Sequence, residues 1–195
     1  MSDYADLDLD PRLVLGGYVE TDAALREEAR PAVDPEGFKA AMRMLAGSVV
    51  MVTAQVEGRL WGLTISACCS MSASPPRVLI SLSHTASCHA AILSTRRFGL
   101  SILRADQRQL ADLGAVPGGP KYVDAFCEGE RSGARIAGAL YHLDCSVDRV
   151  FDVEDHTLII GAVEATIPGR KPVDGSSGPL LYFDREFHAL GGPVE

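Results

Sequence analysis

The segment from Gly62 to Pro76 carries the side chains best suited to holding a ligand. In an extended chain alternate side chains point to opposite faces. One face would then carry a row of small polar groups, Thr64, Ser66, Cys68, Ser70, Ser72 and Ser74, and the other Ile65, Ala67, Cys69, Met71 and Ala73. The polar row offers uncharged donors and acceptors and open backbone N–H groups, which suit a flat heteroaromatic ring with carbonyl and imide edges. The same alternation is also typical of an ordinary amphipathic strand that faces water.

A second candidate site lies between Ser83 and His89, directly before a predicted helix. Hydroxyl and free N–H groups at a helix N-terminus can hold a phosphate, although the same residues also fit a plain capping segment. A third candidate is His156, in the sequence Asp155-His156-Thr157 at a predicted turn, where a histidine is otherwise typical of the solvent-exposed surface. The remaining histidines have no obvious partner along the sequence: His84, His89, His142 and His188.

Several kinds of catalytic and metal site have no motif in this sequence. It contains no Gly-x-Ser-x-Gly elbow, no His-Glu-x-x-His, no P-loop and no Gly-x-Gly-x-x-Gly dinucleotide fingerprint. The five cysteines, an odd number, form no Cys-x-x-Cys pair, which favours free thiols in a reducing cytoplasm. The adjacent Cys68 and Cys69 are not expected to form a disulfide or a metal site, because no histidine lies at zinc-ligand spacing from them.

The elements that must position these residues begin at Asp34-Pro35-Glu36, a helix-start signal with a capping side chain followed by proline. Apolar residues at helical spacing predict a short amphipathic helix that ends at Gly47. A strand is predicted over 48–53, a tight turn at 57–59, and a returning hairpin strand over 60–64. Further strands are predicted over 77–82, 98–103, about 140–153, 156–165 and 180–183, the last of these taken as the final strand. Helices are predicted over 86–95 and from a capping box at 106–109 to Leu113, and loops over 114–120 and 168–179.

Six or more strands separated by short helices do not fit a doubly wound parallel sheet. The pattern favours a mostly antiparallel β fold, either a closed barrel or a sandwich. At 195 residues the chain is expected to form one domain, residues 35–195, preceded by an acidic leader, residues 1–34.

Charge is concentrated in that leader. It holds nine acidic residues and three arginines, whereas the other 161 residues carry a net charge of only −2. A nearly neutral body argues against nucleic-acid binding through a basic face. No apolar run is long enough to span a membrane, and no secretory signal is expected at the N-terminus.

The order of these segments resembles the flavin reductase-like family, the NAD(P)H:flavin oxidoreductase components of two-component monooxygenases. The resemblance covers about residues 36–190. It is carried by residues 38–43, 46–53, 62–67, 70–72, 75–79, 97–103 with Asp106-Gln107, 155–157 with 161–163, and 179–183. Each segment alone is weakly specific, but their shared order over most of the chain is distinctive.

The resemblance implies a fold and a set of binding residues. The fold is a mostly β, six-stranded antiparallel split barrel of Greek-key type that works as a homodimer. The flavin, FMN or FAD, would contact Gly47, Ser48, Thr64, Ile65, Ser66, Ala67, Ser81, Ser83, Ala86, Ser87 and Cys88. The nicotinamide would contact His156, Tyr182 and Arg185. No residue is assigned to acid, base or nucleophilic catalysis, and no metal is expected.

The implied activity is reduction of free FMN or FAD, with NADH as the expected donor and NADPH left open. Reduced flavin would pass to a separate flavin-dependent monooxygenase. Two alternatives remain: a flavin-binding module without turnover, and a dimeric interaction scaffold. The sequence departs from the family at Ala46, where threonine is common, at Thr64–Ala67, where Thr-x-Asn-Ser is common, and at Ala86–Cys88, where Ser-x-Thr is common. The phosphate contacts are the assignment that these departures affect most.

Overall fold

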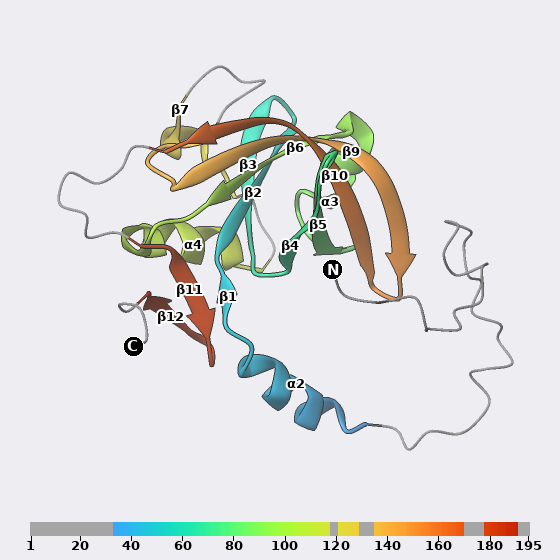
Figure 1. Cartoon of the computed structure of the whole chain (residues 1–195), viewed down its shortest axis with the longest axis vertical. Coiled ribbons are helices and arrows are strands. Elements are labelled where there is room, and N and C mark those ends of the chain that lie inside the picture. Colours follow the sequence, from blue (N-terminus) through green and yellow to red (C-terminus); the bar gives the residue numbers. More distant parts are fainter. Residues whose placement is uncertain (1–32, 118–120, 129–134, 170–177, 191–195) are drawn as a thin grey trace, which may run out of the picture. The chain divides into compact units, whose positions relative to one another are not determined.

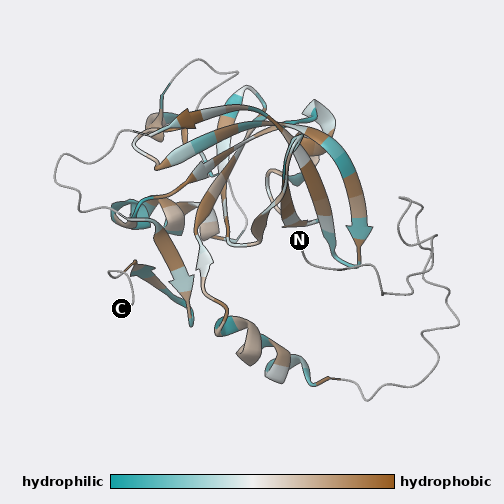
Figure 2. Ribbon diagram, viewed as in Figure 1, coloured by the Kyte–Doolittle hydropathy of each residue, from teal (hydrophilic) through white to brown (hydrophobic). Residues whose placement is uncertain are grey.

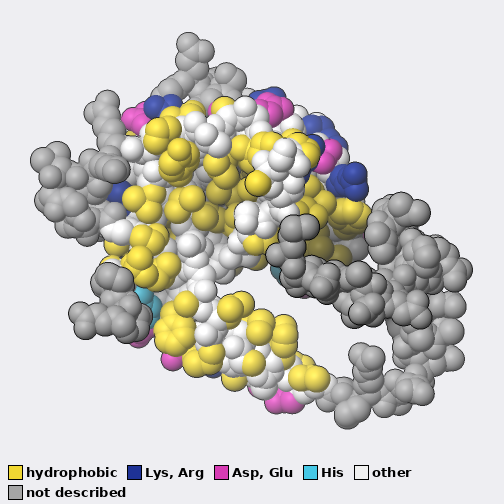
Figure 3. All heavy atoms as spheres, in the orientation of Figure 1, with side chains coloured by type: hydrophobic (Ala, Val, Ile, Leu, Met, Phe, Trp, Pro, Cys, Tyr) yellow, Lys and Arg dark blue, Asp and Glu magenta, His cyan; other side chains and the backbone are white. Residues whose placement is uncertain are grey.

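Helix α2 (Pro35–Arg43) begins where the sequence predicts it. The computed structural model describes residues 33–117, 121–128, 135–169 and 178–190, and the predicted acidic leader lies almost wholly outside them (Figure 1). The Asp34 carboxylate accepts hydrogen bonds from the backbone N–H groups of Glu36 and Gly37, at 3.3 and 3.1 Å, which confirms the predicted cap. No residue of α2 is buried, and Figure 3 shows hydrophobic side chains gathered along the helix. The chain's contacts divide it into two units, Met1–Ala40 and Ala41–Glu195.

The second unit is built on a seven-stranded antiparallel sheet with the order β3-β2-β6-β9-β10-β5-β4 (Figure 1). Its strands are β2 (Val50–Val56), β3 (Arg59–Ile65), β4 (Cys68–Ala73), β5 (Pro76–Ser83), β6 (Arg97–Ile102), β9 (Tyr141–Val153) and β10 (His156–Pro168). The prediction of six strands is wrong for this sheet. The extended run read from Gly62 to Pro76 breaks at Ser66–Ala67, where the Cys68 N–H donates to the Ser66 carbonyl at 2.9 Å, and the second half pairs with β5 as a separate strand.

The two edge strands of this sheet, β3 and β4, are joined by only Ser66 and Ala67. The sheet must therefore curl until its edges approach each other at this point. The Ser81 N–H donates to the Ala67 carbonyl at 3.1 Å and fixes the link against β5. The described ladders include no pairing between β3 and β4, so closure into a split barrel stays a prediction.

A smaller sheet adjoins the large one, with the order β1-β11-β12. Its strands are β1 (Gly47–Ser48), β11 (Leu180–Phe183) and β12 (Glu186–Ala189), so the predicted final strand is followed by one more. Asp184 and Arg185 form the two-residue turn between β11 and β12, both with positive φ, 46° and 67°. A third sheet pairs β7 (Cys127–Glu128) with β8 (Arg135–Ile136).

The helices of the second unit are short. α3 (His89–Thr95) begins three residues later than predicted, and α4 (Arg108–Ala115) follows a 3-10 turn, η2 (Ala105–Gln107); a second such turn, η3, covers Asp124–Phe126. The predicted capping box is displaced by two residues, since the Arg104 N–H donates to the Gln107 side chain at 3.0 Å. Among the described residues, no helix is long and apolar enough to span a membrane.

Strand β2 and the residue before it supply both hydrophobic cores, because alternate side chains point to opposite faces. Val50, Val52 and Ala54 pack into one core together with β5 and α3. Val49 and Met51 pack into the other, which α4 covers. Figure 2 shows hydrophobic stretches along the strands of the seven-stranded sheet. This double burial explains why the sequence from 48 to 54 is almost continuously apolar.

A buried polar chain crosses the sheet at His142, which the sequence left without a partner. The His142 Nδ1 lies 2.8 Å from the Ser101 hydroxyl, and its Nε2 lies 3.1 Å from the Asp144 carboxylate. The His142 side chain is almost fully buried. Burial lowers the pKa of His142 below its ordinary value of 6.5, opposed by the hydrogen bond to Asp144.

We expect acid to destabilise the fold partly through His142. Because its folded pKa is lowered, the unfolded chain binds the proton first as the pH falls through 6.5, and the free energy of unfolding decreases. Between about pH 7 and 5 the slope of unfolding free energy against pH should be shallower in His142→Gln than in the unmodified chain. Urea titrations at several pH values measure this slope. Equal slopes in the two proteins would show that His142 does not contribute to the pH dependence of the free energy of unfolding.

Candidate functional site

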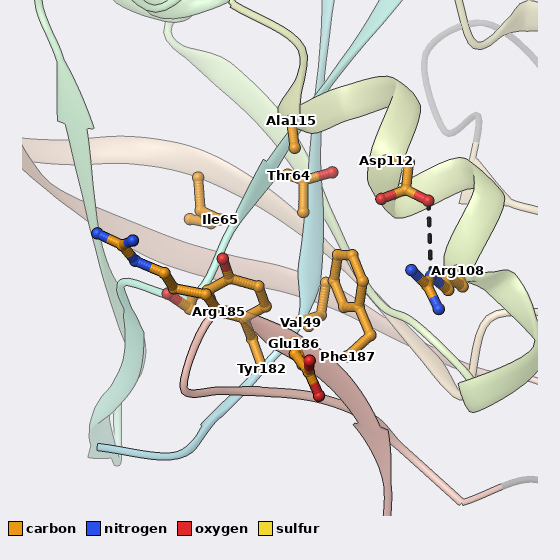
Figure 4. Close-up of a pocket in the computed structure, with 11 residues that line it drawn as sticks. Val49, Thr64, Ile65, Arg108, Asp112, Ala115, Tyr182, Arg185, Glu186 and Phe187 are labelled. Carbon is orange, nitrogen blue, oxygen red and sulfur yellow. Dashed lines mark ion pairs between the residues drawn. The ribbon is translucent and has the colours of Figure 1, made fainter. Parts of the chain in front are cut away.

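A cavity of about 700 Å³ lies where the two sheets and α4 meet. Figure 4 shows that its walls come from segments far apart in the sequence. They are the residue after β1, the end of β3 with the residue that follows it, helix α4 and the β11–β12 hairpin: Val49; Thr64, Ile65 and Ser66; Arg108, Asp112 and Ala115; Tyr182, Arg185, Glu186 and Phe187. The fold thus joins three residues predicted for the flavin with two predicted for the nicotinamide.

The end of β3 forms the uncharged wall of this cavity. Ser66 is exposed, and no described hydrogen bond uses its hydroxyl, which leaves that group available to a ligand. The Thr64 hydroxyl instead donates to the Ala111 carbonyl of α4 at 2.8 Å. Thr64 therefore holds α4 against β3, and its hydroxyl is not the free contact that the predicted polar row implied.

The predicted polar row does not continue past Ser66. Ser70 and Ser72 stand on β4, with a register shift between them, and neither lines the cavity. They border a separate shallow groove of about 420 Å³. The prediction that Thr64, Ser66, Ser70 and Ser72 share one face is wrong. It requires one unbroken strand, and the chain turns at Ser66–Ala67.

Gly47 lies directly beside the cavity wall. A Cβ atom at Gly47 would lie 3.4 Å from the Cβ of Ser66. Gly47 also pairs with Tyr182, and Ser48 with Leu181, in the β1–β11 ladder. The two predicted residues of β1 therefore sit between the uncharged end of β3 and the aromatic hairpin.

The predicted phosphate segment lies at the end of β5 and does not line the cavity. The Ser83 hydroxyl lies 3.0 Å from that of Thr85 and accepts the Thr85 N–H. The Ser87 hydroxyl oxygen is buried with no hydrogen-bond partner among the described residues. Ser83 and Ser87 remain predicted ligand contacts.

Two members of that segment point elsewhere. The Ala86 side chain packs against the hydrophobic core. Cys88 is fully buried, its thiol lies 3.7 Å from the Trp61 carbonyl, and burial raises its pKa to about 11. The side chains of Ala86 and Cys88 therefore belong to the core.

His156 stands at the start of β10, opposite Ser83 in the β5–β10 ladder. Its Nδ1 lies 2.7 Å from the Asp155 carboxylate, and this hydrogen bond lowers the pKa of Asp155. The His156 side chain is 45% exposed and does not line the cavity. The structure thus places it beside the predicted phosphate segment, and apart from Tyr182 and Arg185.

A polar cluster near His156 was missed by sequence reasoning. The His89 Nε2 lies 2.8 Å from the Thr157 hydroxyl, which donates to Asp152 at 3.1 Å. His84 lies 3.6 Å from the same Asp152 carboxylate, and its ring centroid is 5.4 Å from that of His89. Burial lowers the pKa of His89, aided by the nearby His84. His89 and Thr157 are 68 residues apart, so no local sequence pattern predicts their contact.

The cavity residues that sequence reasoning missed are Val49, Arg108, Asp112, Ala115, Glu186 and Phe187. The i, i+4 spacing of Arg108 and Asp112 is a signal that both lie on one face of α4.

Cys68 and Cys69 are free thiols, and burial raises the pKa of Cys68 to about 11. The described residues include no group of three histidine, cysteine or acidic side chains able to hold a metal ion.

Comparison with known proteins gives consistent matches. Residues 42–191 match the flavin reductase-like domain family. The chain is 35% identical to an NADH:riboflavin 5'-phosphate oxidoreductase of Streptomyces pristinaespiralis, covering 83% of this chain and 92% of the relative. It is 34% identical to the reductase component of a 4-nitrophenol 4-monooxygenase/4-nitrocatechol 2-monooxygenase of Rhodococcus opacus, covering 84% and 85%.

A solved structure agrees with these matches. The NADH:FAD oxidoreductase of Streptomyces globisporus, in complex with NAD and FAD fragments, superposes with a TM-score of 0.72 at 26% identity, covering 85% of this chain and 100% of that one.

Proposed function

The chain belongs to the flavin reductase-like domain family, and on this premise we propose that it is an NADH-dependent flavin oxidoreductase. It would reduce free FMN or FAD and release the reduced flavin to a separate monooxygenase, as the Rhodococcus relative is the reductase component of such a system. The observation that carries the proposal is the cavity that joins the uncharged end of β3 to the aromatic and cationic hairpin. NADH is the expected donor because the Streptomyces relatives are named for it.

The described residues fit a flavin at this cavity. Ser66 offers a free hydroxyl, and Gly47 leaves room beside it that a side chain would fill. Ile65 adds an apolar surface for a ring. The phosphate segment lies outside this cavity, and its buried Ser87 hydroxyl would reach a phosphate only after the segment shifts. We assign the ring to Gly47, Ser48 and Thr64–Ala67, and the ribityl phosphate to Ser81, Ser83 and the segment up to Ser87.

Hydride transfer from a nicotinamide to a flavin is chemistry that the two bound molecules supply. This chain has to hold two rings face to face and keep water out. Tyr182 and Phe187 would cover the cavity, and Arg185 would attract anionic groups. His156, held by Asp155 beside the predicted phosphate segment, would position the nicotinamide. No strong acid or base is required.

We also propose a homodimer that works in the cytoplasm. The exposed Phe38, Met42 and Leu45 side chains on and just after α2 provide apolar surface that a second copy would cover. Sedimentation equilibrium should give twice the chain mass. A monomer at micromolar concentration would contradict this.

The proposed reaction is tested by incubating the purified chain with NADH and either FMN or FAD while following the nicotinamide absorbance. We expect loss of NADH that requires both flavin and protein. Absence of a flavin-dependent loss would contradict the proposal. A chain that keeps flavin through dilution but ignores NADH would be a non-catalytic flavin-binding module. A chain that does not bind flavin would be an interaction scaffold.

Replacing His156 with alanine should raise the KM for NADH about fivefold, the effect of losing one hydrogen bond of about 1 kcal/mol. The KM for flavin should change less. The half-exposed His156 ring contributes little to the core, so the fold should persist. Steady-state rates with each substrate varied in turn measure the change in the KM for NADH and the change in the KM for flavin. A larger effect on the KM for flavin would show that His156 contacts the flavin instead.

A further inference from the structure

A second cavity, of about 190 Å³, lies on strands β2, β6 and β9 of the seven-stranded sheet, and we call it the Thr53 cavity. It shares no lining residue with the cavity assigned to the flavin. Thr53 of β2 pairs with Gly99 of β6, and Gly99 pairs with Asp144 of β9. Residues directly opposite each other in antiparallel strands point to the same face. The side chains of Thr53 and Asp144 therefore flank Gly99 at the floor of this cavity.

Gly99 keeps the floor of the Thr53 cavity free of a side chain of its own. A Cβ atom at Gly99 would lie 2.5 Å from the Thr53 hydroxyl and 2.8 Å from Cε1 of His142. Both distances are far below van der Waals contact. Glycine at this position therefore allows the Thr53 hydroxyl and the His142 ring to lie directly over the strand.

The Thr53 hydroxyl is a buried polar group without a partner. Thr53 is 3% exposed, and its hydroxyl makes no hydrogen bond with any residue that the structure describes. Buried polar side chains almost always have a hydrogen-bond partner. Because Thr53 lines the cavity, a molecule bound there can provide that partner.

Asp144 contributes a largely buried carboxylate, and its side chain is 21% exposed. Its hydrogen-bond partner is Nε2 of His142, at 3.1 Å. The Ile136 N–H donates to the Ser101 hydroxyl oxygen at 3.3 Å, so the Ser101 hydroxyl hydrogen is free to donate to Nδ1 of His142. His142 then donates to Asp144 through Nε2 as a neutral ring, a form that the lowered pKa of His142 favours.

The negative charge of Asp144 is therefore not balanced by a cation among the described residues. Arg97 also lines the Thr53 cavity, but its guanidinium pairs with the Glu164 carboxylate at 2.8 Å. A carboxylate that is largely removed from water is stabilised by a positive partner. One oxygen of Asp144 accepts from His142, and the other remains available to a ligand.

The acceptors of the Thr53 cavity match a primary ammonium group. They are the Asp144 carboxylate, the Thr53 hydroxyl oxygen and the side-chain carbonyl of Gln55. An ammonium group has three N–H donors and one positive charge. Leu60 lines the same cavity and offers an apolar contact to a carbon chain. Since a water molecule takes about 30 Å³, the cavity has room for about six water molecules, or for a short alkyl amine.

We propose that the Thr53 cavity binds a small primary alkylammonium ion, with the nitrogen on Asp144 and Thr53 and the carbon chain against Leu60. The proposal is independent of flavin reduction, because no residue that lines this cavity is assigned to the flavin or to NADH.

Titration of the isotope-labelled chain with n-butylamine hydrochloride at pH 7 and constant ionic strength tests this site. Amide chemical shifts should change saturably at Thr53, Gly99 and Asp144. Binding of 1-butanol, which has the same number of heavy atoms and no charge, should be at least about tenfold weaker, because it lacks the charge-assisted hydrogen bond.

Two variants test the assigned contacts. Asp144→Asn should weaken butylammonium binding about tenfold, and Thr53→Val about fivefold. Thr53→Val has nearly the same shape and leaves the pair of His142 and Asp144 intact, so it tests the site even if Asp144→Asn disturbs the fold. Asp148→Asn is the matched control, because it removes a carboxylate from the same strand outside the cavity and should leave the affinity unchanged.

Three results would overturn the proposal. They are equal affinity for butylammonium in all four proteins, equal affinity of the unmodified chain for butylammonium and 1-butanol, and full displacement of butylammonium by an equal concentration of Na⁺. The last result would show that Asp144 attracts any cation without recognising an ammonium group.

Discussion

Replacing Gly114 with alanine should lower the stability of the fold by about 2 kcal/mol, and the Tm by about 4–8 °C for a chain of this size. The added Cβ would lie 2.3 Å from the Thr64 hydroxyl, 2.8 Å from the Thr64 backbone nitrogen and 2.9 Å from the end of Met51. Alanine normally gains about 1 kcal/mol over glycine within a helix. Here the clash outweighs that gain, because a backbone atom cannot move aside cheaply.

The same substitution should also disturb the cavity. The Thr64 hydroxyl donates a hydrogen bond to the Ala111 carbonyl, and the buried Lys121 ammonium donates to the Gly114 carbonyl at 2.8 Å. Because of these two bonds, α4 cannot shift without losing one of them. Thermal unfolding of Gly114→Ala measures the effect. Gly37→Ala is the matched control, since its added Cβ would only touch Asp34 at 3.6 Å and should not lower the Tm. Equal Tm values for the two variants would contradict the close packing of α4 on β3.

Replacing Ser66 with valine should weaken flavin binding about tenfold. The change removes the one free hydroxyl at the end of β3 and adds bulk toward the space beside Gly47. Loss of a hydrogen bond that leaves a ligand group unpaired costs about 1–3 kcal/mol, and about 1.4 kcal/mol corresponds to tenfold in Kd. Valine has high β propensity, so the strand end should tolerate it.

Flavin fluorescence quenching measures this affinity. The control is Ser70→Val, which makes the same change in the same sequence pattern but on β4, outside the cavity. Its flavin affinity should match that of the unmodified chain. If Ser70→Val weakens binding as much as Ser66→Val, the flavin ring lies along β4 and not in the cavity.

The sequence predicted most of the individual elements. Local signals are strong at the Asp34 cap, at the Glu57–Gly58 turn with its positive φ angles, and along the apolar run of β2. The family resemblance is confirmed by the match over residues 42–191. The strand count of the main sheet was too low by one, because the turn at Ser66–Ala67 has no glycine, proline or asparagine to mark it.

The candidate site was only half predictable. Thr64–Ser66 and Tyr182 were found through the order of motifs, whereas Arg108 and Phe187 enter the cavity only because the sheet curls and the hairpin folds over α4. The buried pairing of His142 with Ser101 likewise joins residues 41 apart. Such contacts depend on strand register and packing, which no local pattern encodes.

The proposed hydride transfer depends on the position of the flavin ring. A crystal structure of the chain grown with FMN tests that position directly. We expect ring density against Ile65, Ser66 and Ala67, beneath Tyr182, with the phosphate toward Ser83 and Ser87. Ring density in the groove along β4, or anywhere else away from this cavity, would contradict the proposed flavin site.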